Sequence, residues 1–233
     1  MTAAFVLSEL LSIASPEKAA FLQRFFKTGV GQYAEGDVFL GIIVPHVRSI
    51  AKANRQAPLS ELQVLMKSEY HEARLCALLI LIEQFKKASE AEREVIYTFY
   101  LSHTRRINNW DLVDVTCPHI VGLYLLDKDR SILYDLAESN CLWEQRIAVV
   151  STITFIRRGE YLDTLALAER LIHHPHDLMH KAIGWMLREV GKKDRETLTA
   201  FLERTATTLP RTSLRYAIEH YPESERQYFL KKK

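Results

Sequence analysis

The sequence predicts an all-α fold, an α-solenoid in which two-helix repeats stack around a concave basic groove. Helix-start signals recur along the chain, and no segment has the two-residue alternation and turn chemistry of a sheet. Similar helical segments also return at a regular spacing. With 233 residues, of which 48% are hydrophobic and 26% charged, the chain can bury a sizeable core. We expect one domain over residues 1–233, made of about six helical pairs.

The N-terminal part contains a helix start followed by a loop. The segment Ser15-Pro16-Glu17 combines a cap residue, a proline at the first helical position and an acid in the first turn. Leu22, Phe25 and Phe26 then form an apolar stripe on the expected helix. Residues 29–41 are the glycine-rich part of the chain, and this composition predicts a loop.

Three further helix starts precede residue 100. Pro45 predicts the first of them, since proline is common in the first turn of a helix. In a capping box, a serine and a Glu or Gln three residues later satisfy free N–H groups of the first turn. Ser60 with Gln63, and Ser89 with Glu92, have this spacing. We therefore expect a helix to begin at each serine.

A repeat of about 35 residues runs through the chain after residue 69. Its copies begin where a basic residue enters an apolar helix, at Arg74, Arg146 and Lys181, and each ends in a basic pair. Thirty-five positions separate Arg146 from Lys181, and 72 separate Arg74 from Arg146. This period is typical of the two-helix unit of a solenoid. Arg211 and Arg215 mark a shortened last copy.

The basic residues at the repeat starts allow two interpretations. Equivalent positions of stacked repeats line one surface, so Arg74, Arg146 and Lys181 would form a row suited to a polyanion backbone. Basic residues at helix ends are also common for solvation alone, and repeat scaffolds bind proteins as well. The formal net charge is only +2, so charge by itself does not indicate a nucleic-acid partner.

The copy expected near residue 110 departs from the repeat. Asn108 or Asn109 can cap a helix there, and the basic residue is replaced by Trp110, Asp111 and Asp114. Trp110 and Asp114 are four residues apart, so they lie on one helix face. The helix N-terminus favours an ionised Asp114. A structural role is the alternative, because Trp is usually buried and Asp is common in a first turn.

Four motifs stand in order along the chain: Phe39-Leu40-Gly41-Ile42 with Pro45 and Arg48, Trp110 to Asp114, Leu142 to Arg146, and Lys181 to Glu189. Together they resemble the AlkD-like DNA alkylation repair family over most of the chain, from residue 20 to 220. The resemblance implies HEAT-like helical repeats. It also implies a monofunctional DNA glycosylase that releases N3- and N7-alkylated purines from double-stranded DNA.

The resemblance also assigns the site residues. It places the catalytic aspartate at Asp114, the two active-site tryptophans at Trp110 and Trp185, and the active-site arginine at Arg146. Further residues are expected to contact DNA, most of them through the resemblance and Arg74 through the repeat: Arg188, Lys181, Arg48, Tyr33 and Arg74.

The proposed chemistry suits these residue types. An alkylated purine is a cationic leaving group, and positive charge develops on the sugar as the glycosidic bond breaks. Asp114 could stabilise that charge and orient or deprotonate the attacking water. The faces of Trp110 and Trp185 would attract a cationic nucleotide by about 0.5–2 kcal/mol per contact. Arg146 would hold a nearby phosphate in bidentate fashion. The alternative function is a non-catalytic scaffold that binds DNA structures or proteins.

Other features carry weaker expectations. His173, His174, His176 and His180 include a helical spacing that could bind a metal, but a polar turn explains them as well, and we expect no metal and no cofactor. The three cysteines do not form a disulfide framework, which fits a reducing cytoplasm. We expect neither a targeting signal nor a membrane span, and a monomer without an obligate protein partner.

Overall fold

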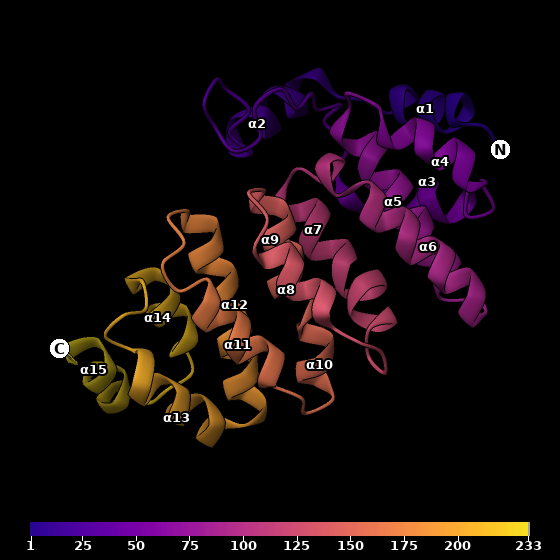
Figure 1. Ribbon diagram of the computed structural model, residues 1–233. Coiled ribbons are helices and arrows are strands. Elements are labelled where there is room, and N and C mark those ends of the chain that lie inside the picture. The colour runs from indigo at the N-terminus through magenta and orange to yellow at the C-terminus, as the bar shows by residue number, and fades with distance from the viewer. Residues whose placement is uncertain (233) are drawn as a thin grey trace. The chain divides into compact units, whose positions relative to one another are not determined.

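The computed structural model describes residues 1–232. Within these residues the regular secondary structure consists of helices (Figure 1). One isolated bridge joins Val38 to Tyr70. The prediction of an all-α fold is confirmed. The helices, in order, are α1 (Ala3–Ser12), α2 (Pro16–Phe25), α3 (Val44–Ala53), α4 (Leu59–Met66), α5 (His71–Phe85), α6 (Glu90–Ser102), η1 (Thr104–Arg106), α7 (Trp110–Cys117), η2 (Pro118–Gly122), α8 (Ser131–Ala137), α9 (Leu142–Ser151), α10 (Ile153–Arg157), α11 (Leu162–Arg170), α12 (Asp177–Lys193), α13 (Arg195–Thr205), α14 (Arg211–Ala217) and α15 (Glu223–Lys231).

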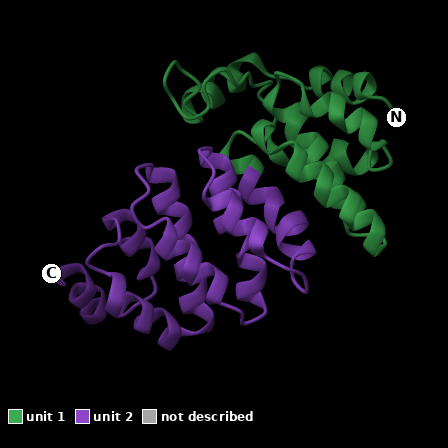
Figure 2. Ribbon diagram, viewed as in Figure 1, with its two compact units in different colours: residues 1–112 green, residues 113–233 purple. Residues whose placement is uncertain are grey.

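The chain divides into two compact units (Figure 2). Unit 1 comprises Met1–Leu112, and unit 2 begins at Val113. The boundary therefore falls inside α7, which starts in one unit and ends in the other. A single domain over the whole chain stays a prediction.

Helix α5 is the centre of unit 1. It packs against α1, α3, α4 and α6, and nearly all of its side chains are buried. A helix that is apolar on every side is buried by its neighbours, and the run from Leu75 to Ile82 has that character. The charged residues at the start of α5 are buried too, and they belong to the site described below.

Helix α12 has the same role in unit 2. It packs against α9, α10, α11, α13 and α14. Gly184 permits the contact with α14, because a Cβ atom at this position would lie 2.6 Å from the carbonyl oxygen of Ser213. The absence of a side chain thus brings the two helix backbones close together and leaves Trp185, the next residue, at a fixed place on α12.

Local signals placed most of the predicted helix starts correctly. Ser15 caps α2 by accepting from the N–H of Lys18, and Ser89 forms the full capping box with Glu92 at the start of α6. The prediction of a capping box at Ser60 is wrong. Helix α4 begins one residue earlier, after the extended Pro58, so Ser60 lies within the first turn and caps nothing.

Replacing Ser89 by Ala should lower the free energy of unfolding by about 1 kcal/mol, because the Glu92 N–H at the start of α6 loses the hydroxyl that caps it. Urea denaturation would measure this loss. Ser102→Ala, which removes exposed hydrogen bonds to the Phe99 carbonyl and the His103 ring at the end of α6, should change it by less than about 0.5 kcal/mol. Equal effects of the two substitutions would contradict the capping role.

The described helices show no candidate for a membrane span, because none combines the required length with sufficient hydrophobicity. Cys76, Cys117 and Cys141 are all free thiols, as expected from their spacing.

Candidate active site

Helix α7 begins at Trp110, directly after two asparagines, as predicted. The Asn109 side chain is buried, and its Oδ1 accepts from the Trp110 N–H at 2.9 Å. Asn108 instead donates through Nδ2 to the Asp37 carboxylate at 2.7 Å. Asn109 therefore accepts the hydrogen bond of the first N–H group of the helix, and Asn108 connects the segment before α7 to the loop at residues 29–41.

The Trp110 ring is half-buried within unit 1. It stacks on Phe26 with ring centroids 5.3 Å apart and an interplanar angle of 27°. Phe25 meets it edge-on at 6.3 Å, and the Phe25 ring itself is 55% exposed. The sequence analysis placed both phenylalanines in the apolar stripe of a helix and predicted no contact with Trp110. Their place beside Trp110 depends on the packing of α2, which no local pattern reveals.

Asp114 and Arg146 form a two-point ion pair within unit 2. Arg146 donates from Nε to one carboxylate oxygen of Asp114 and from Nη2 to the other, both at 2.8 Å. The Arg146 Nη1 donates to the Leu178 carbonyl, which precedes Lys181 on α12. Such a bidentate fork fixes the plane of the carboxylate and compensates its charge. The pair therefore joins α7 to α9, and its third contact reaches α12.

The two partners differ in accessibility. The Arg146 side chain is 6% exposed, whereas that of Asp114 is 16% exposed. Arg146 was expected to hold a phosphate, but in this structure three of its N–H groups are directed at protein acceptors. The geometry thus makes Arg146 the support of Asp114, whose side chain is the more exposed of the two.

Helix α12 carries three more predicted residues. Trp185 is half-buried. Arg188 forms an ion pair with Glu219 and lies over the Tyr216 ring, while Lys181 pairs with Asp177 at 2.8 Å. The Lys181–Asp177 pair is exposed to solvent, so it contributes little free energy.

The remaining DNA-contact candidates lie in unit 1. Arg48 is exposed on α3, and Tyr33 is half-buried in the glycine-rich loop. The prediction that Arg74 contacts DNA is wrong, because its side chain is 1% exposed. It donates to the Asp37 carboxylate at 2.6 Å and to the carbonyls of Ser68 and Glu69 in the segment between α4 and α5. A buried cation that is paired with a carboxylate cannot line a DNA-binding surface, so Arg74 is a structural residue.

A buried chain of charged residues was missed by the sequence analysis. His71, at the start of α5, is 2% exposed and lies between two carboxylates. Its Nδ1 contacts Asp37 at 3.2 Å, and its Nε2 contacts Asp111 at 2.8 Å. Burial alone would lower the pKa of His71, but the negative charge of Asp111 and hydrogen bonds to both carboxylates raise it to about 9. His71 is therefore positively charged at neutral pH.

Glu72, the next residue on α5, organises the end of the glycine-rich loop. Its carboxylate accepts from the N–H groups of Leu40, Gly41 and Ile42 at 2.9, 2.9 and 3.1 Å. Gly41 has a φ of +79°, and a Cβ atom there would lie 2.2 Å from the Ser15 carbonyl oxygen. The Phe-Leu-Gly-Ile motif is thus a backbone segment that turns tightly around one buried carboxylate.

The histidine cluster before α12 is explained by local hydrogen bonds. His176 caps α12 by accepting from the Leu178 N–H through Nδ1, and His180 contacts the His174 carbonyl. His174 also contacts the Gln145 side chain. Among residues 1–232, no group of three or more potential ligands is arranged to hold a metal ion.

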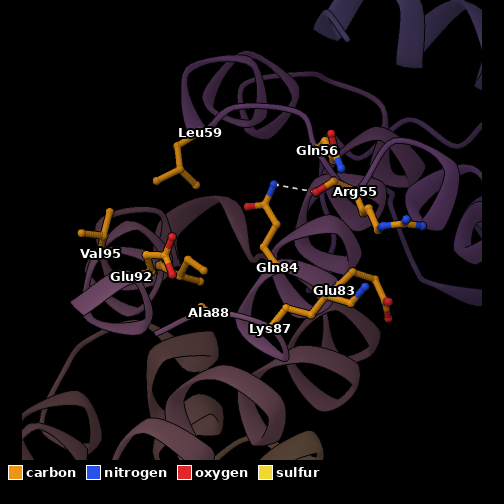
Figure 3. Close-up of a pocket in the computed structure, with 10 residues that line it drawn as sticks. Arg55, Gln56, Leu59, Glu83, Gln84, Lys87, Ala88, Glu92 and Val95 are labelled. Carbon is orange, nitrogen blue, oxygen red and sulfur yellow. Dashed lines mark hydrogen bonds between the residues drawn. The ribbon is translucent and has the colours of Figure 1, made fainter. Parts of the chain in front are cut away.

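A surface hollow of about 450 Å³ lies elsewhere on unit 1, lined by residues of α4, α5, α6 and the segment before α4 (Figure 3). The Gln84 side chain crosses it and donates to the Arg55 carbonyl at 2.9 Å. Its lining includes none of the predicted catalytic or DNA-contact residues.

Comparison with known proteins identifies the family. The family model described as DNA alkylation repair enzyme matches residues 6–221. The chain belongs to this family. Family membership gives this member a role in the repair of alkylated DNA.

One solved structure, described as a predicted DNA alkylation repair enzyme from Enterococcus faecalis, matches this family member with a TM-score of 0.73. The match covers 90% of this chain and 97% of that chain, at 17% sequence identity. At this identity the likeness shows the fold. No match was found among curated proteins.

Proposed function

We propose that the protein is a monofunctional DNA glycosylase that hydrolyses the N-glycosidic bond of cationic N3- or N7-alkylated purines in duplex DNA. The observation that carries this proposal is the Asp114 carboxylate, which Arg146 orients through two hydrogen bonds in a side chain that is 16% exposed. Membership of the alkylation repair family supplies the substrate class.

The reaction needs little help at the base. An alkylated purine carries a positive charge, so it leaves with the electron pair of the glycosidic bond and becomes neutral. Water forms the new bond to the sugar C1′ and releases a proton. Positive charge develops on the sugar during this exchange, and Asp114 would stabilise it electrostatically. The same carboxylate would orient the water or accept its proton.

Trp110 and Trp185 would select the substrate by its charge. The face of an indole attracts a cation by about 0.5–2 kcal/mol, whereas a neutral base gains less. The Phe26 and Phe25 rings hold Trp110 from two directions, so its face has a defined orientation in unit 1. We propose that Arg146 acts as a positioning residue for Asp114.

The direct test is release of free base from duplex DNA that contains N7-methylguanine. Free 7-methylguanine would be separated chromatographically and compared with spontaneous loss in buffer. Release well above the spontaneous rate, with the DNA backbone left intact, is the expected result. Salt-sensitive binding to the same duplex without any release would instead favour the non-catalytic scaffold.

Arg48→Ala should weaken binding to the duplex and flatten its salt dependence. An exposed arginine that neutralises one phosphate contributes about 0.9 to the slope of log affinity against log salt, so the slope should fall by about that amount. Fluorescence anisotropy at several salt concentrations would measure it. Arg204→Ala, at an exposed arginine of α13 that pairs with Glu169, is the control and should leave the slope unchanged. An unchanged slope in Arg48→Ala would remove Arg48 from the DNA interface.

A further inference from the structure

The buried histidine of unit 1 joins two segments that are far apart in sequence. Asp37 belongs to the glycine-rich loop and Asp111 to the first turn of α7, and each faces one ring nitrogen of His71. A carboxylate oxygen only accepts, so both nitrogens must carry protons to satisfy both contacts. The geometry therefore requires an imidazolium at this position.

The charges around His71 balance when it is protonated. Arg74, also on α5, donates to Asp37 at 2.6 Å, so two anions face two cations. Arg106, from η1, lies near Arg74 and donates to the carbonyls of Met66, Lys67 and Ser68 at the end of α4. Loss of the His71 proton would remove the positive charge that contacts Asp111, which is costly in a buried site.

Stacked aromatic rings connect this imidazolium to Trp110. The His71 ring lies 4.4 Å from that of Phe39, which lies 4.9 Å from Phe26, which in turn lies 5.3 Å from Trp110. The second connection is covalent, because Asp111 directly follows Trp110. His71 thus reaches the indole both through packed rings and through the backbone of α7.

We propose that His71 is a positioning residue that, as an imidazolium, ties the glycine-rich loop to the first turn of α7 and so sets the orientation of Trp110 toward a cationic base. This inference rests on the proposed glycosylase function for its substrate. The mechanical part, the control of Trp110 by the charge of His71, stands on the contacts within unit 1 alone.

The stabilisation that His71 provides through Asp37 and Asp111 should depend on pH. The pKa of His71 is raised from 6.5 to about 9, so its stabilising charge is fully present below pH 6.5. The stabilisation declines as the pH rises and is lost above about 9. Base release and the environment of Trp110 should change together in this range.

The test measures the indole N–H signal of Trp110 by NMR in the full-length protein without DNA, assigned with Trp110→Phe. In the wild type this signal should shift with an apparent pKa near 9. His71→Arg keeps a positive charge that does not titrate, so the shift should disappear. His71→Gln should move the signal at every pH and slow single-turnover release of 7-methylguanine by roughly 10- to 100-fold, with DNA affinity nearly unchanged.

His103→Gln is the matched control, because His103 also stacks on an aromatic ring but contacts the Phe99 carbonyl instead of a carboxylate. It should leave the Trp110 signal and base release unchanged. A wild-type Trp110 signal that does not titrate would overturn the inference even if His71→Gln fails to fold. A titrating signal in a protein that releases no base would uphold the tie and overturn the glycosylase function instead.

Discussion

Asp114→Asn is expected to lower the single-turnover rate of 7-methylguanine release by roughly 10²- to 10⁴-fold, the range typical for loss of a general base or an electrostatic stabiliser. The substitution keeps the shape of the side chain but removes the negative charge that faces the developing cation. DNA affinity should change little, because the effect belongs to the transition state. Rapid mixing with excess enzyme, followed by separation of the free base, measures the rate.

The substitution also leaves Arg146 buried with a weaker partner, so stability must be measured alongside activity. A thermal melt decides whether the variant is folded. Glu138→Gln provides the matched control, because Glu138 is an exposed carboxylate of unit 2 that also pairs with an arginine, Arg170. Its release rate should equal that of the wild type. If folded Asp114→Asn releases base at the wild-type rate, Asp114 is not the catalytic carboxylate.

Glu72→Ala should lower the free energy of unfolding of the protein by at least about 3 kcal/mol. Three buried N–H groups lose the carboxylate that accepts their hydrogen bonds, and each unsatisfied group costs about 1–3 kcal/mol. The loop that carries Asp37 would lose its anchor as well. Urea denaturation followed by circular dichroism would report the loss as a lower midpoint.

Glu69→Ala is the comparison for Glu72→Ala. Glu69 is an exposed acid three positions earlier, and removal of its side chain should change stability by less than about 0.5 kcal/mol. A small and equal effect at both positions would show that the loop backbone does not depend on the Glu72 carboxylate.

The features that could be read from the sequence are those decided within a few residues. The starts of α2, α6 and α7 follow from side chains that bond to backbone groups one to three positions away. The glycine-rich loop is similarly local, since Gly31, Gly36 and Gly41 adopt positive φ angles. The failed capping box at Ser60 shows the limit of such signals, because a preceding proline began the helix one residue earlier.

The repeat pattern identified positions but not their burial. Arg74 and Arg146 stand at equivalent repeat starts and were expected to share an exposed surface, yet both side chains are buried against carboxylates. Their acceptors lie 37 and 32 positions away in sequence. No sequence pattern within a few residues of either arginine predicts such a partner.

The sequence by itself determined that the chain is helical, where several helices begin, and that Trp110 and Asp114 share a helix. Only the tertiary structure decided what holds these residues. Arg146 reaches Asp114 across 32 positions, and His71 reaches Asp111 across 40. The physical reason is that capping and helix periodicity are short-range, whereas a buried charge is stable only beside its opposite charge, which the packing of distant helices supplies.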